Sequence, residues 1–162
     1  MNELSFDIKT SADFLKKLKE DFAEYRSDKT SARHALNCAM TAWHLSEWIY
    51  HEFNFDKTFK KVSDFQEDVK NKCSSLVIMH DISNGSKHYK LKYHRPKISQ
   101  TENHIGSFDS SFDSSFDTSR LEISMKDGRI LVFETEIEIV INFWDNYLQN
   151  LSNNAIPPLG VV

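Results

Sequence analysis

Two histidines, a glutamate and two tryptophans occur together in the stretch AWHLSEWIYH (42–51). If residues 34–51 form a helix, one sector of it, about 100° wide, holds most of their polar and histidine side chains, with Glu47 at its border. The members of the sector are His34, Asn37, Thr41, His44, Trp48 and His51. Imidazoles titrate near neutral pH and can exchange protons with a substrate. The sector is therefore a candidate binding site.

The faces on either side of this sector are apolar, which is typical of a helix at the centre of a bundle. One face carries Ala35, Cys38, Ala42, Leu45 and Ile49, and the other carries Leu36, Met40, Trp43 and Tyr50. We expect the polar sector of such a helix to face a cleft or an interface.

A second polar row occurs further along the chain. His80, Asn84, Lys87 and His88 follow the spacing i, i+4, i+7 and i+8, with Asp81 one step aside. A buried imidazole needs partners for both ring nitrogens, so two polar rows favour contact with each other over contact with hydrocarbon. The two helices are predicted to share one pocket.

Three interpretations fit this pocket. The histidines can be core residues that hydrogen-bond across helices, as buried polar groups usually do. They can bind a metal through His44, Glu47 and His51, although H-x2-E-x3-H is not the HExxH of zinc proteases and no Cys-x2-Cys pair accompanies it. The third interpretation is recognition of nucleic acid or chemistry on a phosphodiester.

We adopt the third interpretation for the site residues and predict neither a metal nor another cofactor. His88 is the predicted general acid or base, Lys87 stabilises phosphate charge, and Asn84 orients the scissile group. The residues predicted to bind the substrate are His44, Glu47, Trp48, His51 and His80.

Hydrophobic periodicity predicts the elements that position these residues. Helices are expected over 11–26, from 28 or 30 to about 54, over 59–69, from 73 to 84 or 85, and over 135–151. Ser11 and Asp13 are candidate caps of the first helix, and Asp28 and Thr30 of the second. KDG between RLEISM (120–125) and RILVFE (129–134) predicts a β-hairpin.

The predicted fold is mainly α, a bundle of four to five helices with the hairpin of 120–134 inserted before the last helix. The bundle forms one domain over 1–152. Within it, SFDSSFDSSFDT (107–118) repeats Ser-Phe-Asp three times and is expected to be a surface loop. Residues 153–162 are expected to be an extended tail.

Composition narrows the class of protein. The chain has 162 residues and a net charge of −4, with a local basic stretch, KHYKLKYHRPK (87–97). From its first residues we expect no secretory signal, and the sequence has no apolar run of the roughly 20 residues that a membrane span needs. Cys38 and Cys73 are isolated and are expected to be free thiols. A cytoplasmic protein that does not enter a membrane is predicted.

Two segments carry a resemblance to known proteins. ALNCAMTAWHLSEWIYHEF and DISNGSKHYKL resemble a family of small bacterial proteins over about residues 32–92, together with Trp144. That family is similar to the HEPN superfamily of helical bundles, which occur in toxin–antitoxin and phage-defence loci. Many of its members are metal-independent ribonucleases that dimerise, so the resemblance implies a helical bundle, a homodimer and ribonuclease chemistry.

The chain departs from the HEPN signature, an arginine and a polar residue followed at short distance by a histidine. Asn84, Lys87 and His88 occupy that region without the arginine, and Arg33 has the wrong spacing for His34. HEPN-like domains that lack the signature often serve as binding modules.

The leading prediction is an HEPN-like protein that binds RNA or a nucleotide in a His/Asn/Lys cleft, with cleavage as an additional activity. The alternative is a non-catalytic interaction or regulatory module. It would bind a cognate protein partner or a second copy through Trp43, Trp48, Trp144 and the Ser-Phe-Asp loop.

Overall fold

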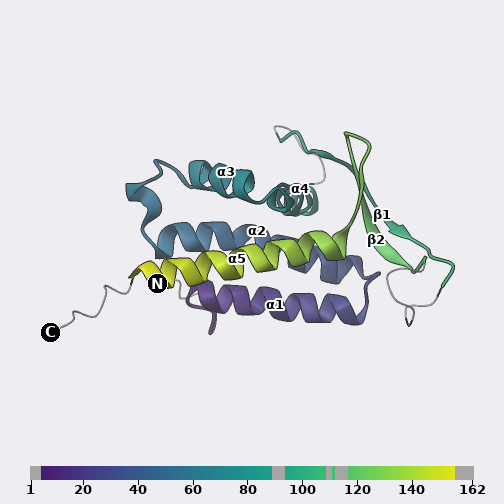
Figure 1. Ribbon diagram of the computed structural model, residues 1–162, viewed down its shortest axis with the longest axis horizontal. Coiled ribbons are helices and arrows are strands. Elements are labelled where there is room, and N and C mark those ends of the chain that lie inside the picture. The colour runs from purple at the N-terminus through teal and green to yellow at the C-terminus, as the bar shows by residue number, and fades with distance from the viewer. Residues whose placement is uncertain (1–4, 89–93, 109–110, 112–116, 156–162) are drawn as a thin grey trace.

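The computed structural model describes residues 5–88, 94–108, 111 and 117–155 of the chain. Its described part contains five α-helices, one short 3₁₀ helix and a three-stranded antiparallel sheet (Figure 1). The helices are α1 (Ser11–Ser27), α2 (Ala32–Glu52), α3 (Val62–Lys72), α4 (Ser75–Lys87) and α5 (Phe133–Ala155), with η1 at Phe55–Lys57. The strands are β1 (Ile98–His104), β2 (Arg120–Met125) and β3 (Ile130–Val132). The mainly helical architecture predicted from the sequence is confirmed.

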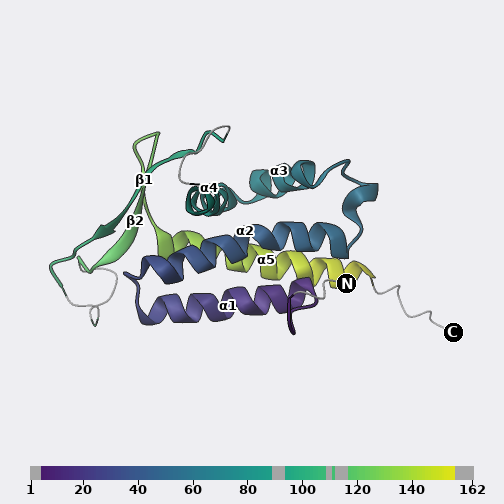
Figure 2. The ribbon, with the colours of Figure 1, turned by 180° about the vertical axis from the view of Figure 1, so that it is seen from behind.

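Helix α2 is the centre of the bundle and contacts each of the other four α-helices. In Figure 1, α1 lies below α2 and α5, while α3 and α4 lie above them, and Figure 2 shows the same layers from behind. The sheet stands at the end of the bundle away from the two termini. Its hairpin leads directly into α5.

The core explains why α2 is central. The Trp144 side chain is fully buried, and its Nε1–H donates a hydrogen bond of 3.0 Å to the backbone oxygen of Ala42. Ala39 and Ala42 are also fully buried, and such small side chains let neighbouring helices approach α2 closely. Burying an aromatic side chain of this size stabilises the fold by about 1.5–3 kcal/mol.

The helix caps differ from those predicted. Thr10 caps α1 in a capping box with Asp13, in which each side chain accepts from the backbone N–H of the other residue. Ser31 caps α2 and accepts from the N–H of His34 at 3.4 Å. Ser11 is instead buried, and its N–H donates to Glu52 at the far end of α2. Asp13 therefore takes part in the cap of α1 as predicted, with Thr10 in place of Ser11, and Ser31 caps α2 in place of Asp28 or Thr30.

The predicted hairpin is present as β2 and β3. Gly128 adopts a φ of +90° in its turn, a conformation that glycine reaches without steric cost. Strand β3 ends at Val132, and α5 begins at Phe133, two residues earlier than expected.

Strand β1 was not predicted and pairs antiparallel with β2, so that β2 is the central strand. Its sequence ISQTENH has no alternation of apolar and polar residues, and five of its seven residues are exposed. Pairing with β2 forms this strand where local preference does not.

The Ser-Phe-Asp tract is described only at Ser107, Phe108, Ser111, Asp117 and Thr118. Phe108 and Thr118 form an isolated β-bridge, and the Phe108 N–H donates to the Asp117 oxygen at 2.9 Å. The prediction of a loop over the rest of the tract falls on residues outside the described part. Helix α5 extends through residues 153–155, where an extended tail was expected, and 156–162 lie outside the described part.

Across the residues that the structure describes, every helix is too short or too polar to cross a membrane.

Candidate functional site

His80 forms the point at which α4 meets α2. Its half-buried ring stacks on Trp43 with 4.1 Å between ring centroids and 30° between the planes. Its Nε2 atom lies 2.8 Å from Nδ2 of Asn84, one helical turn further along α4. Two residues of the predicted polar row, His80 and Asn84, are thus in contact. Their neighbour on α2 is a tryptophan of the apolar face rather than the predicted row of histidines.

Asp81 ties α4 to the start of β1. The residue is only 4% exposed, and its Oδ2 atom accepts from the backbone N–H groups of Lys97 at 2.6 Å and Ile98 at 3.2 Å. Its Oδ1 atom lies 2.5 Å from Nε2 of His94. A buried carboxylate is stable only with such partners, so this arrangement fixes both His94 and the first residues of the strand.

The rings of His94 and His80 are also in contact. Their centroids are 4.6 Å apart, and the planes meet at 60°. Two imidazoles and a carboxylate from α4 and the α4–β1 connection therefore occupy one small region, which we call the His80–His94 cluster (His80, Asp81 and His94).

The surroundings of His80 favour its neutral form. Burial is the main cause, and the positive charges of His94 and Lys70 add to it, so that the pKa of His80 falls to about 4. Lys70 lies above the Trp43 ring, 5.9 Å from its centroid, and pairs with Glu67 at 2.7 Å. At neutral pH, His80 is an uncharged imidazole that can accept a hydrogen bond or bind a metal ion.

The remaining predicted site residues lie outside the cluster. His44 is exposed on α2, and desolvation of the covered part of its ring lowers its pKa, an effect that Glu47 opposes and Lys87 strengthens. Glu47 and His51 are exposed on α2 as well. His51, near the end of that helix, contacts the neighbouring Tyr50 ring at a centroid distance of 5.1 Å.

Lys87 and His88 are both exposed at the end of α4. The N–H of His88, the capping residue, donates to the Asn84 oxygen at 3.0 Å. The predicted catalytic residues therefore lie near the end of one helix, with Lys87 electrostatically coupled to His44 across the α2–α4 contact.

The three tryptophans do not form an exposed aromatic surface. Trp144 is fully buried, and Trp43 is 7% exposed beneath His80. Trp48 is half-buried and stacks on Phe14 of α1 at 4.8 Å, on a different side of α2 from Trp43. These side chains contribute mainly to packing between helices.

Sequence reasoning missed His94, Trp43 and Lys70 as members of the site and placed Asp81 beside the row. The signal for them was weak. His94 is separated from His80 by a connection of irregular length, and Trp43 falls on a face that helical periodicity assigns to the core.

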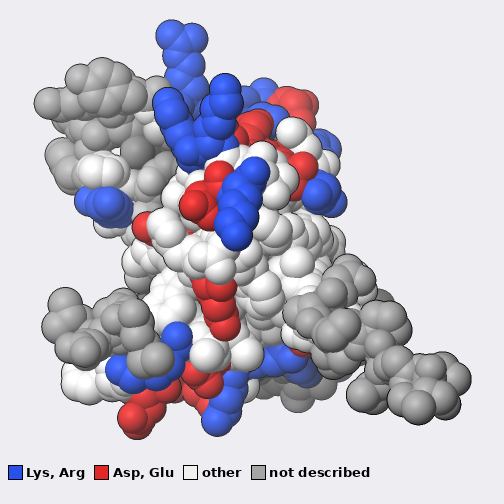
Figure 3. Space-filling model, turned by 90° about the vertical axis from the view of Figure 1, so that its left-hand side faces the viewer, with Lys and Arg blue, Asp and Glu red and all other residues white. Residues whose placement is uncertain are grey.

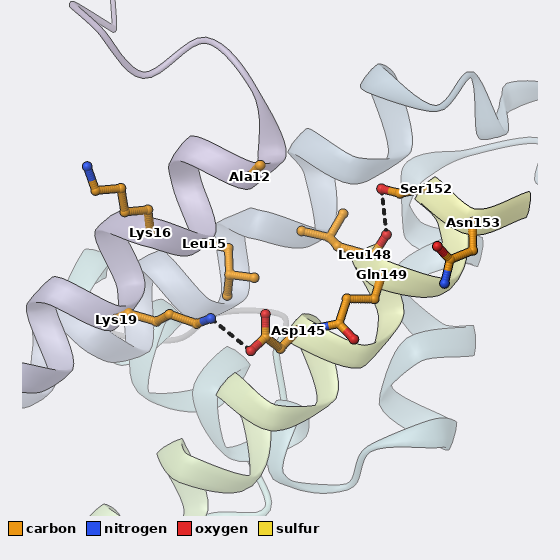
Figure 4. Close-up of a pocket in the computed structure, with 9 residues that line it drawn as sticks. All are labelled: Ala12, Leu15, Lys16, Lys19, Asp145, Leu148, Gln149, Ser152 and Asn153. Atoms are coloured by element: carbon orange, nitrogen blue, oxygen red, sulfur yellow. Dashed lines mark hydrogen bonds and ion pairs between the residues drawn. The ribbon is translucent and has the colours of Figure 1, made fainter. Parts of the chain in front are cut away.

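Three hollows in the surface of the described structure lie around the bundle. One groove of about 630 Å³ lies between α1 and α5, where Lys19 and Asp145 form an ion pair of 2.8 Å (Figure 4). A second hollow lies between the start of α2 and the sheet. A third, of about 400 Å³, lies between α4 and β1 and is lined by Asp81, Gly85, Pro96 and Ile98 among others. Of these three, only the last touches the His80–His94 cluster.

The connection from α4 to β1 is the most basic part of the chain. Residues 82–101 contain five Lys or Arg residues and no Asp or Glu, although the whole chain has a net charge of −4. In α3, by contrast, cations form ion pairs with carboxylates of the same helix: Lys70 pairs with Glu67, and Lys72 pairs with Asp68. Figure 3 shows blue and red side chains close together at the top of the face at the end of the bundle opposite the sheet.

No protein-family model matches the chain, and searches of curated proteins and of solved structures also found no match. The likeness to HEPN proteins therefore stays a prediction from the two quoted segments.

Proposed function

We propose that this HEPN-like chain binds RNA through the basic connection that follows α4, with a nucleotide as the smaller ligand of the same surface. The observation that supports the proposal is the run of five cations without an acidic residue over 82–101. The phosphate backbone dominates the affinity of proteins for nucleic acids, and a local cluster of Lys and Arg is its usual counterpart.

The described cations of this segment are available to a ligand. Lys87, Arg95 and Lys97 are all exposed, and none of the three forms an ion pair with another residue of the described structure. All of them follow Asp81 in the chain, and the Asp81 carboxylate accepts from the backbone N–H of Lys97 and so holds the backbone there in place. A fixed backbone reduces the ordering cost of binding a charged chain.

The aromatic residue beneath this segment is covered, which predicts the mode of binding. Trp43 is only 7% exposed because His80 stacks on it, so its ring is not open to stacking by a base. Contacts to phosphate carry no sequence information. The affinity of the proposed binding therefore depends on the length of the RNA and on the salt concentration rather than on the base sequence.

Cleavage is the second part of the proposal. His88 is exposed at the end of α4 beside Lys87, so an imidazole and a cation are both within reach of a bound phosphate. The His88→Ala variant is expected to abolish ribonuclease activity while leaving the melting curve intact. Unchanged cleavage by that variant would remove His88 from the mechanism.

Fluorescence anisotropy with a labelled single-stranded RNA at low salt tests binding. The triple variant Lys87→Ala, Arg95→Ala, Lys97→Ala is expected to bind at least about tenfold more weakly than the wild type. A matched control removes three exposed cations at the other end of the bundle, Lys57, Lys60 and Lys61, and is expected to bind within about twofold of the wild type. Equal losses in both variants would show a non-specific charge effect and contradict the proposal. Competition by ATP or AMP shows whether a nucleotide occupies the same surface.

Self-association is a second candidate function, and the sheet supports it. Within the described structure, β1 is an edge strand paired only with β2, and Ile105, which follows it, is 84% exposed. An open edge can pair with the edge of a second copy. A homodimer measured by size exclusion with light scattering, and lost in an Ile105→Lys variant, would favour this interaction module. A monomer at all concentrations would exclude it.

A further inference from the structure

We propose that the His80–His94 cluster is a binding site for a divalent transition-metal ion of the zinc type. It is the one group of three or more His, Cys, Asp or Glu residues in the described structure whose ligand atoms come together as a metal requires. One ligand atom from each of His80, Asp81 and His94 lies within 4.8 Å of the others. The inference does not depend on RNA binding.

The distances suit an ion after small side-chain rotations. Zinc bonds of about 2.0–2.2 Å in a tetrahedral arrangement place ligand atoms roughly 3.4 Å apart. The Asp81 Oδ1 to His94 Nε2 distance of 2.5 Å would lengthen, and the widest distance in the cluster would shorten. In this exchange the ion takes the place of the hydrogen between the carboxylate and Nε2 of His94, and the neutral ring carries its hydrogen on Nδ1 instead.

The residues around the cluster already hold the ligands as a metal site does. The second oxygen of Asp81 accepts from two backbone N–H groups, and Nε2 of His80 lies 2.8 Å from Nδ2 of Asn84. When Nδ1 of His80 binds the ion, Nε2 carries the hydrogen, and the Asn84 amide has to turn so that its oxygen accepts from it. The remaining ring nitrogen of His80, Nδ1, makes no hydrogen bond with a described residue. Ligating imidazoles and carboxylates commonly have such outer partners, which fix their orientation.

A second group of a histidine with carboxylates differs from the His80–His94 cluster, because an arginine already neutralises its carboxylates. His104 lies 2.6 Å from Asp117 and 3.9 Å from Glu122. Arg120 lies between these groups, 2.7 Å from Glu122 and 3.6 Å from Asp117, so its guanidinium already supplies the positive charge. Asp81 has no Lys or Arg within ion-pair distance among the described residues.

The donor set selects the class of ion. Two imidazole nitrogens and one carboxylate oxygen suit first-row transition ions, whereas Mg²⁺ and Ca²⁺ prefer sites made entirely of oxygen. Three protein ligands leave a coordination position open, as in catalytic zinc sites. A water molecule or the phosphate oxygen of a ligand on the neighbouring basic connection would fill it.

Isothermal titration of the full chain, freed of metal with EDTA and then desalted, tests the site. ZnCl₂ is expected to bind with one equivalent per chain, and MgCl₂ is expected to give no binding. The His94→Ala variant is expected to bind Zn²⁺ at least about 100-fold more weakly, because even outer partners of a metal ligand contribute 10–100-fold. The matched control His104→Ala removes another half-exposed histidine paired with a carboxylate and is expected to keep the wild-type affinity.

Two further measurements keep the test decisive. His80→Ala is expected to lose binding as His94→Ala does, with far-UV circular dichroism to show that the variant is folded after the loss of the Trp43 stack. Wild-type protein with Co²⁺ reports on the same site through its visible ligand-field absorption, which needs no variant. The proposal is overturned if the wild type binds Zn²⁺ no more tightly than His94→Ala, or if His104→Ala causes the same loss. RNA does not enter these titrations, so their outcome is independent of the proposed function.

Discussion

Replacement of Asp81 by alanine is expected to destabilise the protein more than any change at an exposed carboxylate. The Asp81 carboxylate is buried and receives hydrogen bonds from the N–H groups of Lys97 and Ile98 in addition to its contact with His94. The variant leaves both N–H groups without this acceptor and releases the start of β1 from α4. The same change frees the imidazole that we place in the metal site.

The magnitude follows from the number of partners lost. An unsatisfied buried donor costs about 1–3 kcal/mol, and breaking a buried charged pair by removing one partner costs about 3–5 kcal/mol. We therefore expect Asp81→Ala to lower the free energy of unfolding by about 3–5 kcal/mol. Asp81→Asn keeps an oxygen for the two N–H groups and is expected to lose only about 1–2 kcal/mol.

Urea denaturation at pH 7 in EDTA measures these differences without a contribution from bound metal. Asp117→Ala is the matched control, because Asp117 also lies close to a histidine, 2.6 Å from His104, but its side chain is 47% exposed. That control is expected to lose at most about 1 kcal/mol. A double-mutant cycle of Asp81→Ala with His94→Ala is expected to give a coupling energy of about 0.5–3 kcal/mol.

The reasoning fails if Asp81→Ala and Asp117→Ala lose the same free energy. It also fails if Asp81→Asn is as unstable as Asp81→Ala, since the two N–H groups would then not depend on an acceptor at this position.

Three further predictions concern packing and the backbone. The Tyr25 hydroxyl is buried and makes no hydrogen bond within the described structure, so Tyr25→Phe is expected to keep or raise the free energy of unfolding, by up to about 1 kcal/mol; a loss in urea denaturation would show an unseen partner. A methyl group on Gly85 would meet no atom, so Gly85→Ala in α4 is expected to stabilise by roughly 0.5–1 kcal/mol. A methyl group on Gly106 would collide with backbone atoms of Asp117 and Thr118, so Gly106→Ala is expected to destabilise by about 1–3 kcal/mol; equal melting temperatures for the two glycine variants would contradict this account.

Helical periodicity and turn residues were enough to predict the helices and the hairpin. The stripe of apolar residues in α2 and the Asp-Gly turn at 127–128 are local signals, and the structure contains both the helix and the hairpin. Strand β1 has no such signal, because its sequence is polar on both faces. It exists through its pairing with β2, which lies far along the chain.

The site was predictable only in part for the same reason. The i, i+4 spacing of His80 and Asn84 brings them into contact within one helix. The partner of His80 across the helices is Trp43, because stacking an imidazole on an indole satisfies the apolar face of α2 without a second polar row. His94 reaches Asp81 through an irregular connection, whose path no periodicity describes.

The salt dependence of RNA binding tests the proposed function most directly. Three phosphate contacts by Lys87, Arg95 and Lys97 predict that the logarithm of the association constant falls with the logarithm of salt concentration with a slope of about −2.1 for a single strand. The triple variant of Lys87, Arg95 and Lys97 is expected to reduce the magnitude of this slope by about 2. A wild-type slope near zero, or a slope that the triple variant leaves unchanged, would contradict RNA binding by the connection between α4 and β1.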